Sequence, residues 1–274
     1  MNNFDFLLCP ICRSKLFSCG KVLSCQKRHS FDISSDGYVN LALGKSGSGD
    51  SLEMCRARRD FLAQGYYLPF AEAISEEVKK FSPLSPKLIC DAGCGEGFYL
   101  RVMKKNLPNF NYIGFDLAKD SLRFASKAEK ISPSPISYAV SGIFDMPLSP
   151  LSCSAVISVF APVPHEEANR ILAENGILVV AHPGEKHLSG FKNKLYNTPY
   201  DNAEKELFFP NFEMCREKRV KYSVFVEKKD MKNLLLMTPY YWKTSKDDTD
   251  RFLCLDGFET ELDFIISVFR KSDK

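Results

Sequence analysis

The sequence predicts an α/β protein with a mainly parallel sheet covered on both faces, preceded by a small metal-binding module. Three observations predict this architecture. Apolar runs typical of buried strands alternate with amphipathic helical patterns from residue 87 onward. A glycine-rich turn at 93–97 joins the first of these strands to a helix. Near the N-terminus, three cysteines and a histidine have the spacing Cys-x2-Cys-x12-Cys-x3-His, which is typical of a zinc site.

The N-terminal cysteines and histidine predict a structural zinc centre. The four residues are Cys9, Cys12, Cys25 and His29. Thiolates and an imidazole in two knuckles close a tetrahedral site without an open position, so the zinc would have a structural role. The chain has ten cysteines and no evident export signal, which favours metal binding over disulfides and indicates a reducing, cytoplasmic location. A segment this short buries little core, so the metal would supply much of its folding energy.

Residues 44–86 are predicted to connect this module, residues 1–43, to a sheet domain at 87–274. The connection begins with a glycine- and serine-rich stretch at 44–51, which indicates a flexible linker. Amphipathic patterns then predict two helices, at 54–63 and 70–81.

Strand and helix patterns alternate through the sheet domain. The predicted strands are 88–91, 112–116, 136–140, 155–160 and 177–182. The predicted helices between and after them are 96–106, 120–127, 165–173 and 185–195. Beyond them we expect a strand at 212–226, a helix at 228–236 and a last strand at 258–269 that could insert antiparallel. This alternation implies ligand binding at the carboxyl ends of the parallel strands.

The glycine-rich turn has the pattern Asp-x-Gly-x-Gly-x-Gly, which begins at Asp91. A dinucleotide fingerprint would need a third glycine where Phe98 stands, and the Gly-Lys-Ser/Thr of a phosphate loop is absent from the turn. The turn resembles instead the S-adenosylmethionine loop of Rossmann-like class I methyltransferases. Asp116 ends the next strand about twenty residues later, where such folds place an acid that binds ribose hydroxyls. The expected donor-binding residues of this region are Asp91, Gly93, Gly95, Glu96 and Asp116.

Further motifs follow one another along the whole chain. After the zinc motif they are Gly37-Tyr38-Val39-Asn40-Leu41, Gly49-Asp50-Ser51, Ala57-Arg58-Arg59, the glycine loop, Ala161-Pro162, Pro183-Gly184 with His187-Leu188, and Leu235-x-Met237-Thr238-Pro239 with Trp242. In this order they resemble the RlmA family of 23S ribosomal RNA (guanine-N1) methyltransferases, and the resemblance spans nearly all 274 residues.

The resemblance implies an enzyme that methylates N1 of a guanine in a 23S ribosomal RNA hairpin and works as a homodimer. It implies that the zinc module recognises the RNA, and that Tyr67, Gly95, Glu96 and His187 contact S-adenosylmethionine. One departure from the wider superfamily is Ser141-Gly142 after the third strand, where an acid that contacts adenine is common. Recognition of the adenine therefore stays open.

The sequence offers several candidates for the chemistry itself. Guanine N1 carries a proton in the neutral base, so a carboxylate or a water molecule near N1 could remove it. Asp145 and Glu166 follow the third and fourth strands at the correct edge of the sheet, although acids there are more often solvated. Phe160 could line the pocket for the base and Trp242 could stack on a base, but both aromatic residues are expected more often in the core.

Two alternatives remain beside the RNA methyltransferase. One is a methyltransferase for a small molecule such as a quinone, and the other is a zinc-ribbon RNA-binding protein that holds S-adenosylmethionine without turnover. The zinc module and the arginines of the first helix disfavour a small substrate. The net charge of +3 permits a nucleic-acid partner without requiring one. No apolar run approaches membrane-spanning length, so no membrane partner is expected.

Overall fold

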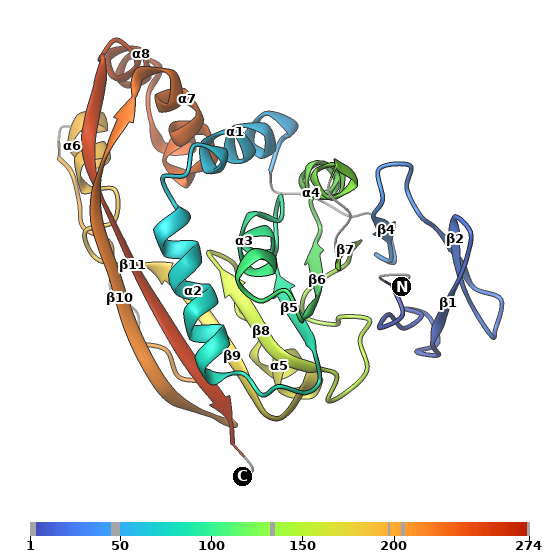
Figure 1. The fold of residues 1–274 in the computed structure, drawn as a ribbon. Helices are drawn as coiled ribbons and strands as arrows, with labels where there is room; N and C mark the ends of the chain where they lie inside the picture. The colour runs from blue at the N-terminus through green and yellow to red at the C-terminus, as the bar shows by residue number, and fades with distance from the viewer. Residues whose placement is uncertain (1–3, 45–49, 132–134, 197, 204–205, 273–274) are drawn as a thin grey trace.

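An eight-stranded sheet forms the centre of the molecule, and helices lie against both of its faces (Figure 1). The computed structural model describes residues 4–44, 50–131, 135–196, 198–203 and 206–272, so most of the predicted linker lies outside the described residues. The strand order is β10-β11-β9-β8-β5-β6-β7-β4. None of the described helices is both long and apolar enough to cross a membrane.

Five parallel strands occupy the middle of this sheet. They are β5 (Leu88–Ala92), β6 (Asn111–Asp116), β7 (Ile136–Val140), β8 (Cys153–Val159) and β9 (Leu172–Pro183). Every residue of β5, β7 and β8 is buried, as expected for parallel strands covered on both faces. This burial explains the continuous apolar runs in the sequence and confirms the predicted parallel sheet.

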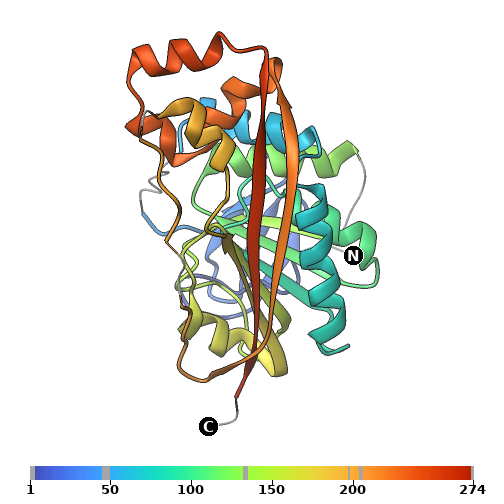
Figure 2. The same ribbon diagram turned by 90° about the vertical axis from the view of Figure 1, so that its left-hand side faces the viewer.

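A long antiparallel hairpin completes one side of the sheet (Figure 2). Its strands are β10 (Phe212–Glu227) and β11 (Gly257–Lys271). β11 lies between β10 and β9 and runs antiparallel to both, which confirms the insertion that the sequence predicted as possible. Between the two strands the chain forms α7 (Lys228–Met237), the 3-10 helix η1 (Pro239–Lys243) and α8 (Lys246–Leu253) at one end of the hairpin (Figure 1).

Helices cover the two faces of the sheet unequally. On one face lie α2 (Leu68–Phe81), α3 (Phe98–Asn106) and α4 (Lys119–Ile131). On the other face lies α5 (His165–Ile171), beside the N-terminal module. Near the carboxyl ends of the strands lie α1 (Leu52–Ala63), which packs on α4 and α7, and α6 (Ser189–Leu195).

Several predicted helices differ from the structure in their bounds, among them those expected at 185–195 and 165–173. The helix expected from residue 185 begins only at Ser189, because the preceding turn is bonded to β11: Gly184 N–H donates to the carbonyl of Asp263, and Leu188 N–H donates to that of Glu261. The helix expected to run to residue 173 ends at Ile171, and the chain joins β9 directly.

The N-terminal module joins the central sheet by one of its own strands. It contains a small antiparallel sheet of β1 (Leu16–Cys19), β2 (Val22–Cys25) and β3 (Ser30–Asp32). β4 (Val39–Asn40) then pairs in parallel with β7 and forms the eighth strand of the central sheet. Apolar side chains of the module, among them Leu7 and Leu16, belong to one buried cluster with Ile113 and Phe115 of β6. The division of the chain into units at residues 43 and 86 stays a prediction.

Candidate active site and metal centre

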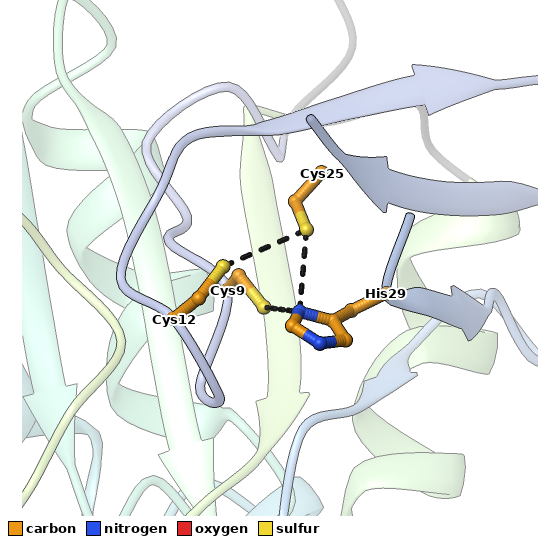
Figure 3. A group of neighbouring side chains, drawn as sticks. All are labelled: Cys9, Cys12, Cys25 and His29. Atoms are coloured by element: carbon orange, nitrogen blue, oxygen red, sulfur yellow. Dashed lines mark hydrogen bonds between the residues drawn. The ribbon is translucent and has the colours of Figure 1, made fainter. Parts of the chain in front are cut away.

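The three cysteines and the histidine of the zinc motif converge at one point of the N-terminal module (Figure 3). Cys9 Sγ and Cys25 Sγ lie 3.4 and 3.5 Å from His29 Nδ1, and Cys12 Sγ lies 3.7 Å from Cys25 Sγ. Ligands around a tetrahedral zinc, at about 2.3 Å for sulfur and about 2.0 Å for nitrogen, would be roughly 3.5–3.8 Å apart. The donor set and its spacing therefore fit zinc, and four protein ligands give it a structural role.

Two tight turns hold these ligands. In the first, Arg13 N–H donates to the carbonyl of Cys9 at 2.8 Å, and in the second, Arg28 N–H donates to the carbonyl of Cys25 at 2.9 Å. Both arginines have positive φ, 58° and 65°. Each turn supplies two of the four ligands, Cys9 and Cys12 from the first and Cys25 and His29 from the second. The short spacing within each pair therefore predicts the site from the sequence.

The glycine-rich turn after β5 has an unusual backbone at each of its three glycines. Gly93, Gly95 and Gly97 have φ values of 91°, 52° and 78°, in the region that favours glycine. A Cβ atom at Gly93 would lie 2.7 Å from Cβ of Ala161, and one at Gly97 would lie 2.2 Å from the hydroxyl of Tyr138. At Gly95 a Cβ atom would meet nothing within 4 Å. The turn is therefore packed at both ends and faces open space at its middle glycine.

Asp116 joins the end of β6 to this turn. One carboxylate oxygen accepts a hydrogen bond from Gly95 N–H at 2.8 Å, and the other accepts one from Ala118 N–H at 2.8 Å. Burial raises the pKa of Asp116, while these two N–H donors oppose the shift. Each oxygen keeps a further lone pair and can accept a hydrogen bond from a ribose hydroxyl.

Two further carboxylates are buried at this turn. The residue Asp91 is 1% exposed, and neither of its carboxylate oxygens has a partner among the described residues. Burial, and then the charge of Asp116, raise the pKa of Asp91. Glu96 is also buried; one of its oxygens pairs with Arg101 at 2.5 Å and the other has no partner in the described part of the chain. Unpartnered buried oxygens are acceptors that a ligand rich in N–H and O–H groups would satisfy.

Tyr67 and His187, which are 120 residues apart in sequence, lie in contact. The hydroxyl of Tyr67 is 3.3 Å from Nε2 of His187, and Nδ1 of His187 accepts the backbone N–H of Asp263 at 3.4 Å. Burial lowers the pKa of His187 to about 3, so the ring is neutral. With Nδ1 as acceptor the ring proton is on Nε2, which donates to the oxygen of Tyr67. The hydroxyl proton of Tyr67 is then available to another acceptor.

Phe160 connects this pair to the glycine turn. Its ring centroid lies 6.4 Å from that of Tyr67 and 6.0 Å from that of His187, and the next residue, Ala161, approaches Gly93. Phe160 is 45% exposed and has a φ of 54°, which is uncommon for an aromatic residue. Such strained positions gather at functional sites. The structure thus places Phe160 at the candidate site and not in the core.

The remaining candidates lie apart from this group. Asp145 forms an ion pair with Arg13 of the N-terminal module, and Glu166 is exposed in the first turn of α5. Their role as a general base stays a prediction. Trp242 is 68% exposed on η1, so the expectation that it fills the core is wrong.

Glu167, which no sequence motif singles out, is buried beside Glu166. It accepts the backbone N–H of Met146 at 2.6 Å and pairs with Arg170 at 2.6 Å. Arg170 also donates to the carbonyls of Met146 and Leu148. The pair of Glu167 and Arg170 therefore holds the loop after β7 in place. The only sequence signal for it is the spacing Glu-x-x-Arg on a helix.

Two of the three arginines on α1 bond within the protein. Arg58 pairs with Asp50 at 2.5 Å and donates to the carbonyl of Met237 at 3.5 Å. Arg59 pairs with Asp60 at 2.6 Å and lies over the ring of Phe124. The helix therefore presents less free positive charge than its sequence suggests.

Comparisons with known proteins agree with this arrangement. Residues 7–42 match the family model "RlmA, N-terminal", a zinc ribbon, and residues 89–178 match the model "Methyltransferase domain". The Bacillus subtilis (strain 168) protein YxjB, provisionally named a 23S rRNA (guanine-N1)-methyltransferase, is 31% identical over 261 residues, which are 89% of this chain and 90% of that protein. The 23S rRNA (guanine(748)-N1)-methyltransferase of Streptomyces fradiae is 26% identical over 257 residues, 91% of this chain and 90% of that protein.

A solved structure shares the fold of the sheet domain. It comes from work on the conversion of a disulfide bond into a thioacetal group during echinomycin biosynthesis. Its TM-score is 0.51 at 10% identity, over 74% of this chain and 82% of that chain, so the similarity concerns the fold alone.

These findings confirm the predicted fold class and cofactors. The sheet domain has the Rossmann-like class I methyltransferase fold, with S-adenosylmethionine as the methyl donor that such a domain implies. The zinc-ribbon match and the four converging ligands fit one structural zinc ion. The similarity to the relatives runs through both the module and the sheet domain. The chain therefore belongs to the RlmA family of 23S rRNA (guanine-N1)-methyltransferases.

Proposed function

We propose that this protein transfers a methyl group from S-adenosylmethionine to N1 of a guanine in 23S ribosomal RNA. The observation that carries the proposal is the similarity of nearly the whole chain, zinc module included, to relatives named for this reaction. A methyltransferase for a small molecule would share the sheet domain but would have no need of the module. The non-catalytic alternative would bind the donor and RNA without turnover.

In the proposed site the chain supplies a set of acceptors for the donor. Asp116, already bonded to the glycine turn, would accept hydrogen bonds from the ribose hydroxyls. The free oxygens of Asp91 and Glu96 would accept N–H groups, including the ammonium group of the methionine part. Tyr67 and His187, which are in contact with each other, would also line the donor site. S-adenosylmethionine supplies an electrophilic methyl group, and the rate then depends mainly on how the protein positions the acceptor nitrogen.

Phe160 would form one wall of the pocket for the guanine. It is half exposed and lies between the glycine turn and the Tyr67–His187 pair. N1 is in the pairing face of guanine, so the base must be unpaired or rotated out of its stack to enter. Because Asp145 is paired with Arg13 and Glu166 is exposed, we favour water over either carboxylate as the acceptor of the N1 proton.

A substitution at Gly95 tests the position of the donor. Gly95→Arg should abolish donor binding, because its side chain would enter the open space beside the turn. The matched control is Gly20→Arg in the β1–β2 turn, where φ is also positive, at 64°, and a Cβ would also meet nothing within 4 Å. Calorimetric titration with S-adenosylhomocysteine measures both variants. Wild-type affinity in Gly95→Arg would place the donor elsewhere.

The exposed tryptophan on η1 is a candidate for stacking on an unpaired base of the RNA. Trp242 contacts Tyr241, with ring centroids 5.2 Å apart, and is otherwise open to solvent. Stacking of one base on an aromatic side chain contributes about 1–3 kcal/mol, so Trp242→Ala should weaken RNA binding by about 5- to 150-fold. Fluorescence anisotropy with an RNA hairpin measures the change, and donor affinity should stay the same. Phe208→Ala, at another exposed aromatic residue, is the control; equal effects of both variants would argue against stacking.

The reaction itself is tested by methyl transfer from labelled S-adenosylmethionine to unmodified large-subunit ribosomal RNA. A methyl group on guanine N1 blocks base pairing, so primer extension should stop at one guanine in a hairpin. Guanine 748, the position named for the Streptomyces fradiae relative, is the first to inspect. Label without a stop would indicate another atom. Donor binding without label on RNA would favour one of the two alternatives.

The assembly and the location of the protein stay predictions. The resemblance predicts a homodimer, and the cysteine content predicts the cytoplasm. Light scattering at several concentrations would measure the mass in solution. A mass of one chain at micromolar concentration would contradict the predicted dimer.

A further inference from the structure

The turn between β9 and α6, residues 184–188, carries His187 and is fixed by one residue of β11. Asp263 is fully buried, at 0% exposed, and meets the turn at three points. Its carbonyl accepts Gly184 N–H at 2.8 Å, and its carboxylate accepts Lys186 N–H at 3.0 Å. Its own N–H donates to Nδ1 of His187 at 3.4 Å. The main chain and the side chain of Asp263 therefore both determine where His187 lies.

The carboxylate of Asp263 is itself held by Arg219 of β10. Nε and Nη2 of Arg219 each donate to one carboxylate oxygen at 2.7 Å, in a bidentate pair that fixes the plane of the group. Burial alone would raise the pKa of Asp263, but Arg219 and Lys186 N–H lower it below the ordinary value, so the carboxylate is charged. Glycine is required at 184, because a Cβ there would lie 2.7 Å from the carboxylate.

We propose that Arg219 and Asp263 act as a positioning pair for the methyl donor. They hold the turn so that Nδ1 of His187 faces the N–H of Asp263. The ring proton must then be on Nε2, which donates to Tyr67 and leaves the Tyr67 hydroxyl free to donate to the ligand. The proposal rests on the proposed donor-binding role of Tyr67 and His187. Neither member of the pair touches the donor in this proposal, so both act through His187.

Without the pair, the turn would lose the bond between Lys186 N–H and the carboxylate, and the imidazole could move away from the backbone N–H of residue 263. Either tautomer of His187 would then be possible, and the Tyr67 hydroxyl could donate to the imidazole instead of to the ligand. The expected consequence is weaker donor binding with little change in the methyl-transfer step once the donor is bound. A change in donor affinity without a change in kcat distinguishes a positioning role from a general loss of structure. A general loss of structure would impair donor binding, RNA binding and kcat together.

A second ion pair on the same strands provides a matched control. Lys221 of β10 and Glu261 of β11 form an ion pair at 3.1 Å, and Glu261 is two residues from Asp263 on β11. The carboxylate of Glu261 bonds to Lys221 and not to the 184–188 turn. Glu261→Gln removes an ion pair between the same two strands without disturbing His187.

The test measures steady-state kinetics of the full-length, zinc-loaded protein with its RNA substrate, and donor affinity by calorimetry. Asp263→Asn should raise KM for S-adenosylmethionine and the Kd of S-adenosylhomocysteine about tenfold, the loss expected for one misplaced charge-assisted contact. The kcat at saturating donor and KM for RNA should change by less than about twofold. Arg219→Lys should give a smaller effect, since lysine keeps the charge but not the bidentate geometry. Glu261→Gln should match the wild type.

The outcomes separate this inference from the proposed function. If His187→Gln leaves donor affinity unchanged, the donor role of His187 fails and the positioning role with it. If His187→Gln weakens donor binding and Asp263→Asn does not, only the positioning role is overturned. A lower melting temperature of Asp263→Asn with an unchanged KM would show that the pair is merely structural. Should Asp263→Asn fail to fold, Arg219→Lys decides, and wild-type donor affinity in that variant overturns the proposal.

Discussion

Substituting Cys25 by serine will destabilise the entire chain and not the N-terminal module alone. Loss of a structural metal is among the few changes that cost about 4 kcal/mol or more. Cys25 is one of four zinc ligands, and the module around it has too small a core to fold without the metal. The unfolding free energy of the full-length protein should fall by an amount of this order.

Loss of the zinc should also lower the stability of the sheet domain, because backbone hydrogen bonds join the module to that domain. β4 pairs with β7 in the central sheet, and Leu8 N–H donates to the carbonyl of Pro147 at 2.8 Å. Leu7 and Leu16 cover apolar side chains of the sheet. An unfolded module would leave the edge of β7 unpaired and this apolar surface exposed to water.

Thermal unfolding with and without a chelator, together with donor binding, measures this coupling. Cys19→Ser is the matched control, because Cys19 is exposed and lies outside the ligand cluster. We expect one cooperative transition that moves to lower temperature in Cys25→Ser and a parallel loss of donor affinity. Two separate transitions, with the upper one unchanged, would instead show an autonomous module.

Replacement of Asp91 by asparagine should stabilise the donor-free protein while it weakens donor binding. Asp91 is buried and, within the described residues, has no partner for either oxygen, so its charged form is costly until a ligand arrives. A neutral amide of similar shape removes that cost. It would also remove the charge-assisted contact that we propose between Asp91 and the donor, which should lower the affinity by about 10- to 100-fold.

The pH dependence of stability gives Asp91 a second signature. The pKa of Asp91 in the folded protein lies above the ordinary value of 3.8, so the folded state binds more protons than the unfolded state above that pH. The contribution of this group to stability therefore declines as the pH rises from about 4. Asp91→Asn should lack this decline in chemical unfolding curves recorded across the range.

Asp116→Asn is the contrasting control for Asp91→Asn. Both oxygens of Asp116 accept backbone N–H groups, so an amide there loses one acceptor and should destabilise the donor-free protein. If Asp91→Asn also lowered the melting temperature, the buried carboxylate would have a structural partner and our account of the site would be incorrect. Unchanged donor affinity would remove Asp91 from the site.

Features with a local signal could be predicted from the sequence. The buried parallel strands appear as continuous apolar runs, and the zinc ligands appear as two short knuckles, so both are confirmed. The Tyr67–His187 contact could be expected only through the family resemblance, because it joins segments 120 residues apart. Asp263 lies in a strand where an acid suggests a solvent-facing position, and its partner Arg219 is 44 residues away. Trp242 departs from the expectation that tryptophan is buried, because here the neighbouring Tyr240 occupies the buried position.

The pairing of β4 with β7 also sets an order of events during synthesis. All four zinc ligands have left the ribosome once residue 29 has emerged, but Val39 pairs with Ala139, a hundred positions later. At a synthesis rate of about 5–20 residues per second, roughly 5–20 s pass between completion of the zinc site and synthesis of β7, the strand with which β4 pairs. During that interval the central sheet does not support the nascent module, and its thiolates are held by the small β1–β3 sheet and by the metal. We therefore expect that depletion of zinc during synthesis lowers the yield of folded protein, as measured by the soluble fraction.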